Sequence, residues 1–249
     1  MKKGSEMKMS IAQLLFVALP YVALVALLVG GIYRYRYRGF QVTSLSSQLL
    51  EGKALFWGTQ PFHWGLLAVF LGHLAAFAIP QSVLSWNTSP TRMLVLELAM
   101  FAFALGALFG LVMLVVRRIR SARLRVVTSK MDVFLYALLL FQLTTGVLVA
   151  YRYNWGLGWF SGVLTPYLRS IFVLSPAFDT MTGMPTLVQI HVISAFVLFG
   201  MIPFTRLIHF TVFPLNYTWR RWQQVIWNWN PKAIRESDSQ SPGVRPRNN

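Results

Sequence analysis

Five apolar blocks, each long enough to cross a lipid bilayer, constrain this chain more than any other feature of its sequence. They cover residues 11–33, 62–80, 93–116, 131–151 and 187–210. About 20 apolar residues span the hydrocarbon core as an α-helix, because a helix rises about 1.5 Å per residue. Only 12% of the 249 residues are charged and 55% are hydrophobic, which is too little charge to cover a soluble domain. The sequence therefore predicts an all-α polytopic membrane protein, a bundle of five transmembrane helices.

The Lys and Arg residues between the blocks predict the orientation of the bundle. Sixteen lie in the first connection, the third connection and the segment after the fifth block, against six on the opposite side. Because basic residues favour the cytoplasmic side, we expect the N-terminus outside and the C-terminus in the cytoplasm. We expect one membrane domain over residues 1–230 and a polar cytoplasmic tail over 231–249 with a composition typical of disorder.

Charge and cysteine content exclude several functional classes. The net charge of +16 would suggest nucleic acid on a soluble domain, but these charges flank apolar blocks, so no nucleic-acid partner is expected. The chain contains no cysteine. That excludes an iron–sulfur cluster held by thiolates of this chain, and it excludes the C-x-x-C-H attachment of a c-type haem.

The four histidines of the chain all lie inside predicted spans, His63 and His73 on the second and His191 and His209 on the fifth. A single histidine in a span is most simply an interhelical hydrogen-bonding group. Two pairs on two helices, with none elsewhere, favour a functional role, because ionisable residues inside a membrane are costly.

The predicted topology pairs these histidines. The second and fifth spans run in opposite directions, so His63 and His209 are expected toward the cytoplasm and His73 and His191 toward the outside. The rises of about 15 and 27 Å along the two helices would place two centres roughly 21 Å apart. Five helical turns separate His191 from His209, so both are expected to face the same way, although Pro203 is expected to kink the span.

Haem suits this pattern better than zinc, because a structural zinc needs four ligands at one point and these histidines lie at two depths. Two imidazoles without a thiolate suit a six-coordinate b haem with no open position. Gly65 and Gly72 share nearly one helix face and could admit a flat macrocycle, although ordinary helix packing accounts for them equally well. Arg206, Arg117 and Arg118 are placed to bind haem propionates, and the last two would also anchor the cytoplasmic side.

Several short motifs accompany the histidines. They are Pro20-Tyr21, Arg34-Tyr35, Ser46-Ser47-Gln48-Leu49-Leu50, Phe62-His63-x-Gly65, Phe70-x-Gly72-His73, Gln142 with Gly146, and Pro203-Phe204-Thr205-Arg206-Leu207-Ile208-His209. With these motifs over most of its length, the chain resembles the gamma subunit of respiratory nitrate reductase, a dihaem cytochrome b.

The resemblance implies an anchor in the bacterial or archaeal cytoplasmic membrane for a molybdenum catalytic subunit and an iron–sulfur subunit. It implies that quinol is oxidised near an outer haem b held by His73 and His191. Electrons then pass to an inner haem b held by His63 and His209, and on to the iron–sulfur subunit. The family's ligand pairing agrees with the pairing predicted from topology.

The quinol site departs from the family pattern. Well-studied members carry a lysine after the second span that is implicated at this site, and Met93 stands in its place here. We hypothesise that Arg92 and Glu97 border the site, because both are ionisable near the outer end of the third span. Alternatively, Arg92 is an interfacial anchor and Glu97 its structural partner. No catalytic residue is assigned.

Two other interpretations stay open at this point. Dihaem subunits of nitrite-oxidising, sulfite-type and heterodisulfide-type complexes resemble this chain as well, and electrons could then flow in the reverse direction. A haem-free transporter or structural bundle, with its histidines in a proton path, is a different class and predicts a colourless purified protein.

Overall fold

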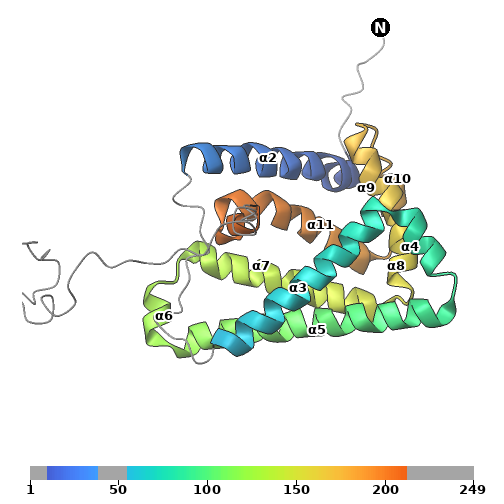
Figure 1. Cartoon of the computed structure of the whole chain (residues 1–249). Coiled ribbons are helices and arrows are strands. Elements are labelled where there is room, and N and C mark those ends of the chain that lie inside the picture. Colours follow the sequence, from blue (N-terminus) through green and yellow to red (C-terminus); the bar gives the residue numbers. More distant parts are fainter. Residues whose placement is uncertain (1–9, 39–54, 212–249) are drawn as a thin grey trace, which may run out of the picture. The chain divides into compact units, whose positions relative to one another are not determined.

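The computed structural model describes residues 10–38 and 55–211, and these residues fold as helices joined by turns (Figure 1). Five helical stretches in those ranges are long and apolar enough to span a membrane: Ile11–Tyr37, Leu55–Ala78, Pro90–Arg120, Lys130–Arg152 and Thr186–Phe204. The predicted all-helical fold with five long apolar helices is confirmed. The predicted orientation stays a prediction, and the tail and the domain boundary at residue 230 lie outside the described residues.

Short helices precede, follow or connect the long helices. The first half of the chain contains α1 (Ile11–Gln13), the π-helical η1 (Leu14–Ala18), α2 (Leu19–Tyr37), α3 (Leu55–Ala78), α4 (Pro80–Trp86), α5 (Pro90–Arg120) and α6 (Ala122–Val126). The second half contains α7 (Lys130–Arg152), α8 (Gly156–Trp159), the π-helical η3 (Phe160–Leu164), α9 (Thr165–Phe172), α10 (Asp179–Thr182), α11 (Thr186–Met201) and the 3₁₀-helical η4 (Ile202–Phe204) and η5 (Arg206–Phe210).

The long helices pack in a series that differs from their order in the sequence. The most extensive contact joins α3 to α5, and α5 also packs on α7. Helix α7 packs in turn on α11, and α11 packs on α2 (Figure 1). The two helices that carry the histidine pairs, α3 and α11, are therefore connected through α5 and α7.

Glycines allow α3 and α5 to approach closely. A Cβ atom added to Gly65 would lie 2.4 Å from the carbonyl oxygen of Phe103, and one on Gly110 would lie 2.4 Å from the backbone nitrogen of Phe62. Neither backbone atom can move aside without moving its helix. The crossing of these two helices therefore requires the absence of a side chain at both positions.

A proline in the first span leaves a carbonyl without its helical donor. Pro20 has no N–H to donate to the carbonyl of Phe16, four residues earlier. The hydroxyl of Tyr167 on α9 donates to that carbonyl instead, at 2.8 Å. Burial of Tyr167, and secondarily the nearby Tyr21, raise the pKa of the phenol, so the hydroxyl keeps its proton at physiological pH.

Helix α9 also caps the end of α3. The guanidinium of Arg169 donates to the carbonyls of Phe77 at 2.9 Å and Ala78 at 3.1 Å, and the Thr165 hydroxyl donates to Ala76 at 3.2 Å. The last carbonyls of a helix have no hydrogen-bond donor within that helix, and a cation there also interacts favourably with the negative end of the helix dipole.

The fifth span ends earlier than the sequence predicted. Helix α11 stops at Met201, and the backbone of Thr205 is extended, with φ −120° and ψ 176°, between the short helices η4 and η5. Pro203 cannot donate a backbone hydrogen bond, which weakens the helix there, and the Thr205 hydroxyl accepts from the backbone N–H of Leu207 to begin the next turn. The five-turn spacing that predicted His191 and His209 on one helix face therefore does not apply, because the helix is not continuous between them.

The α3–α5 crossing yields a stability prediction. We expect Gly110→Ala to lower the free energy of unfolding by about 1–3 kcal/mol, because the new Cβ overlaps the α3 backbone. Gly106→Ala on the same helix is the matched control, because a Cβ there meets nothing within 4 Å. Since Ala favours helices over Gly, the control should be neutral or stabilising. Thermal unfolding in detergent measures both, and equal melting temperatures would contradict the close crossing.

Candidate functional site

Three of the four histidines use Nδ1 to donate a hydrogen bond to a backbone carbonyl. The acceptor is Thr59 for His63 at 2.9 Å, Val69 for His73 at 2.8 Å, and Arg206 for His209 at 2.5 Å. A carbonyl oxygen only accepts, so Nδ1 of each neutral ring carries the proton and Nε2 presents a lone pair. Metal-binding histidines commonly show this arrangement, because the second nitrogen fixes the tautomer and the ring orientation. The donor set therefore fits Nε2 ligation of an iron.

His191 is held by side chains of α7 rather than by its own helix. Its Nδ1 lies 3.0 Å from Oγ1 of Thr145. The amide nitrogen of Gln142 lies 3.2 Å from Nδ1 and 3.3 Å from Nε2, and the carbonyl oxygen of that amide accepts from Ser194. A Cβ on Gly146 would come within 2.9 Å of the ring. The sequence motif of Gln142 and Gly146 thus lies directly against a predicted ligand.

His73 packs against the segment that follows the fourth span, and its pairing with His191 stays a prediction. The ring of Phe160, in the π-helical η3, packs edge to face on His73, with 5.1 Å between ring centroids. Irregular π-helical turns often occur at functional sites. His73 is thus held between its own helix and the segment after the fourth span.

The segments that carry the predicted inner pair, His63 and His209, meet through other side chains. Phe210, beside His209, packs edge to face on Phe70 of α3, with 5.1 Å between ring centroids. This contact brings η5 against α3, the helix that carries His63. Pairing of His63 with His209 stays a prediction. Within residues 10–38 and 55–211, no three His, Asp or Glu side chains converge as metal ligands, so these histidines do not form one four-ligand centre.

The predicted macrocycle-contacting glycines lie at a helix contact. A Cβ on Gly72 would meet the Met100 side chain at 2.3 Å, and Gly65 lies against Phe103 and Ala107 of α5. Helix packing, the alternative role considered for both glycines, accounts for their positions. A role in binding a cofactor stays a prediction.

Two of the three predicted propionate-binding arginines, Arg206 and Arg118, lie beside Asp132, which was not among the predicted site residues. Asp132 is 6% exposed and accepts from Nε of Arg206 at 2.7 Å, while Nη1 of Arg118 lies 3.7 Å away. Arg118 also donates to Thr128 and lies over the ring of Tyr136. The side chain of Asp132 caps α7 as well, because it accepts from the backbone of Ser129 at 3.0 Å. The Ser-x-x-Asp spacing and an acidic residue inside an apolar block were the available signals.

The cluster of Asp132, Arg118 and Arg206 combines one acidic side chain with two basic ones. One carboxylate faces two guanidinium groups, so the three side chains carry a net positive charge. Arg117 is also buried, at 6% exposed. Guanidinium groups can bind the carboxylates of a haem, and this role for Arg206, Arg117 and Arg118 stays a prediction.

The two predicted quinol-site residues have separate surroundings. The Arg92 guanidinium donates to the Thr88 hydroxyl at 3.4 Å and lies 5.0 Å from the centre of the Trp86 ring. Glu97 is partly exposed, and its carboxylate lies 3.6 Å from where a Cβ on Gly156 would stand. The contacts of Arg92 are typical of an interfacial anchor. Their part in a quinol site stays a prediction.

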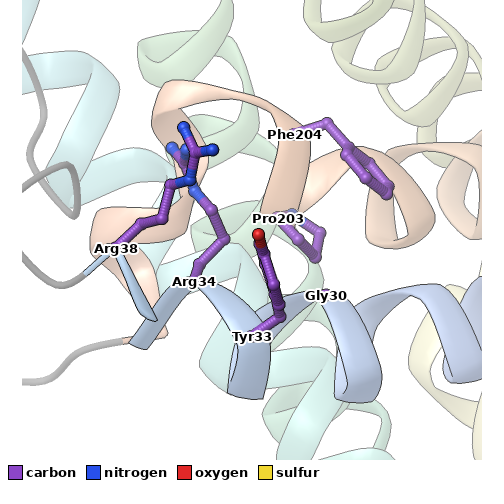
Figure 2. Close-up of a pocket in the computed structure, with 6 residues that line it drawn as sticks. All are labelled: Gly30, Tyr33, Arg34, Arg38, Pro203 and Phe204. Carbon is purple, nitrogen blue, oxygen red and sulfur yellow. The ribbon is translucent and has the colours of Figure 1, made fainter. Parts of the chain in front are cut away.

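A pocket of about 270 Å³ lies at the end of α2, lined by Gly30, Tyr33, Arg34, Arg38, Pro203 and Phe204. Figure 2 shows both arginine side chains rising from the end of α2, with the Tyr33 ring beside Pro203. None of the four histidines lines this pocket, so it is distinct from the candidate metal ligands.

Comparison with known proteins gives a consistent family. The family described as nitrate reductase gamma subunit matches residues 12–228. The nitrate reductase gamma chain of Bacillus subtilis (strain 168) is 34% identical over 212 residues, which cover 84% of this chain and 95% of that protein. The respiratory nitrate reductase 1 gamma chain of Escherichia coli K12 is 29% identical, covering 83% and 93%. A nitrate reductase-like protein of Mycobacterium tuberculosis is 31% identical, over 84% of this chain and 33% of that longer protein.

The buried carboxylate yields a second stability prediction. Asp132→Asn keeps the shape and the capping hydrogen bonds but leaves Arg206 and Arg118 without their counter-charge. We expect a loss of about 3–5 kcal/mol in the free energy of unfolding, because breaking a buried ion pair strands the remaining charge. Asp179→Asn, at an exposed carboxylate, is the matched control and should change stability by no more than about 0.5 kcal/mol. Similar melting temperatures for both variants would refute a structural role for Asp132.

Proposed function

The chain belongs to the nitrate reductase gamma subunit family, and from this premise we propose that it oxidises quinol and delivers the electrons to a cytoplasmic iron–sulfur subunit. Family membership supports a membrane subunit of respiratory nitrate reductase. The observation that carries the finer proposal is the Nδ1 hydrogen bonding of His63, His73 and His209, which leaves Nε2 available on those three rings. Nitrate reduction itself then belongs to a molybdenum subunit that this chain anchors to the membrane.

Two pairs of histidines hold the cofactors in this proposal. His73 and His191 hold an outer haem b, and His63 and His209 hold an inner one. Each haem, when bound, supplies a one-electron carrier with no open coordination position. The backbone carbonyls of Thr59, Val69 and Arg206 keep three of these rings in the ligating tautomer, and Arg206 and Arg118 offer positive charge to the haem carboxylates.

The substrate reaction fits the proposed arrangement. A quinol that becomes a quinone releases two electrons and two protons, so one quinol supplies two one-electron transfers. In this proposal Arg92 and Glu97 border the quinol near the outer pair, where a guanidinium and a carboxylate can hydrogen-bond its hydroxyl groups. The predicted location is the cytoplasmic membrane of a bacterium or archaeon, with the protons released outside.

The decisive experiment is a dithionite-reduced minus oxidised spectrum, with haem quantitation, on the detergent-purified complex. We expect two b haems per chain, both reducible by a quinol analogue, and co-purification of a molybdenum subunit and an iron–sulfur subunit. A protein without haem would overturn the cytochrome assignment. Haem with a different reductase as partner would instead place this chain in another respiratory complex.

Ligand variants test the pairing. His73→Ala should remove the outer haem and abolish quinol oxidation while the inner haem stays visible, because each haem depends on its own two imidazoles. His209→Ala should remove the inner haem and leave the outer one. Haem quantitation and low-temperature spectra distinguish these outcomes, and two intact haems in either variant would contradict the assignment.

Separate variants test the quinol site. Arg92→Ala and Glu97→Gln should each lower the rate at which a quinol analogue reduces the haems, while haem content stays at the wild-type level. Arg152→Ala, at an exposed arginine ending α7, is the matched control and should leave the rate unchanged. Wild-type rates in both test variants would reduce Arg92 and Glu97 to structural roles.

A further inference from the structure

His191 differs from the other three histidines in what its Nδ1 contacts. Those three use a carbonyl of their own segment, three or four residues earlier. His191 uses instead a neighbouring helix, through the Thr145 hydroxyl at 3.0 Å. Thr145 is 5% exposed, so water does not compete for this contact. The orientation of one proposed ligand therefore depends on the register of α7 against α11.

The hydrogen bonds of Thr145 determine the direction of this contact. Its hydroxyl has one proton and lies 2.9 Å from the carbonyl of Phe141 and 3.0 Å from that of Gln142. When the proton points to one of these carbonyls, which only accept, a lone pair of Oγ1 remains for the imidazole. The Nδ1–H of His191 then donates to Thr145, and Nε2 carries the lone pair.

Gln142 makes a competing contact. Its amide nitrogen only donates, and it lies 3.2 Å from Nδ1 and 3.3 Å from Nε2 of His191, so with Nδ1 protonated its available acceptor is Nε2. A metal on Nε2 and this N–H would use the same lone pair, so metal binding requires the amide group to turn away from Nε2. The Ser194 hydroxyl, which donates to the carbonyl oxygen of this amide, holds the Gln142 side chain between α7 and α11.

Gly146 provides the surface on which the ring lies. An added Cβ would stand 2.9 Å from Cε1 and 3.6 Å from each ring nitrogen of His191. Contacts below 3.0 Å do not persist, so any side chain at this position would tilt or displace the imidazole. Thr145 and Gly146 are consecutive residues, so one helical turn of α7 sets both the hydrogen bond and the position of the ring.

We infer that Thr145 and Gly146 are positioning residues that set the tautomer and the plane of His191, and thereby the redox properties of the iron it would ligate. This inference rests on the proposed function. A hydrogen bond from Nδ1–H to an acceptor makes the imidazole a stronger electron donor through Nε2. Stronger donation stabilises ferric iron relative to ferrous iron, which lowers the reduction potential of the outer haem.

A redox titration of the purified complex tests the hydrogen bond. Thr145→Val keeps the shape of the side chain but removes the acceptor, so the midpoint potential of the outer haem should rise while that of the inner haem stays unchanged. Thr145→Ser should restore the wild-type potential, because it restores the hydroxyl. Thr144→Val is the matched control at the adjacent, exposed position and should leave both potentials unchanged.

Electron paramagnetic resonance tests the role of Gly146. The g-values of a low-spin ferric haem with two imidazoles depend on the angle between the ring planes. Gly146→Ala should therefore shift the signal of the outer haem and leave the signal of the inner haem unchanged. Since Ala favours helices over Gly, α7 itself should remain folded.

The outcomes separate this inference from the proposed function. A wild-type complex without haem refutes the proposed function. A wild-type complex with two haems, whose outer potential and signal do not change in Thr145→Val and Gly146→Ala, refutes only the positioning role. A loss of thermal stability without any change in potential or signal would also refute it, because a purely structural contact would behave in that way.

Discussion

A backbone carbonyl that loses its helical donor inside a bilayer has no water to replace it, and much of this structure follows from that constraint. The hydroxyl of Tyr167 donates to the carbonyl of Phe16, to which Pro20 has no N–H to donate. The guanidinium of Arg169 donates to the last carbonyls of α3. Both donors belong to α9. This short helix therefore joins the first span to the end of α3, and His73 lies only five residues before that end. The position of one proposed haem ligand thus depends on how neighbouring helices complete their hydrogen bonds.

Apolar block length and histidine number were the sequence features that carried the most structural information. Block length depends on composition alone, so five long apolar helices could be predicted, and the described part of the chain contains five. The helix ends could not, because they depend on partners distant in the sequence. Pro203 indicated that the fifth span is disturbed at this position, but the local sequence does not distinguish a helix that kinks there from one that ends there. The extended backbone at Thr205 arises from its own capping hydrogen bond, which only the folded chain reveals.

The surroundings of the histidines show the same division. The sequence placed all four in spans, but His209 lies in η5, beyond the end of the fifth span, and the contacts that orient the four rings could not be predicted. The face on which a glycine lies is also undetermined by spacing: Gly65 and Gly72 share a helix face, and the structure places that face against α5. Gly146 was noticed only as part of a motif, although it touches a proposed ligand directly. The ion pair of Asp132 could not be predicted, because Arg206, which donates to it, is 74 residues away in the sequence.

That long separation has a consequence for how the protein is made. Ribosomes add about 5–20 residues per second, so Arg206 is synthesised roughly 4–15 s after Asp132. During this interval α7 would enter the membrane with a carboxylate near its start. Arg118, made earlier and 3.7 Å from Asp132 in the finished structure, is available as an interim counter-ion. The two arginines around one aspartate are therefore synthesised at different times, Arg118 before the carboxylate and Arg206 after it.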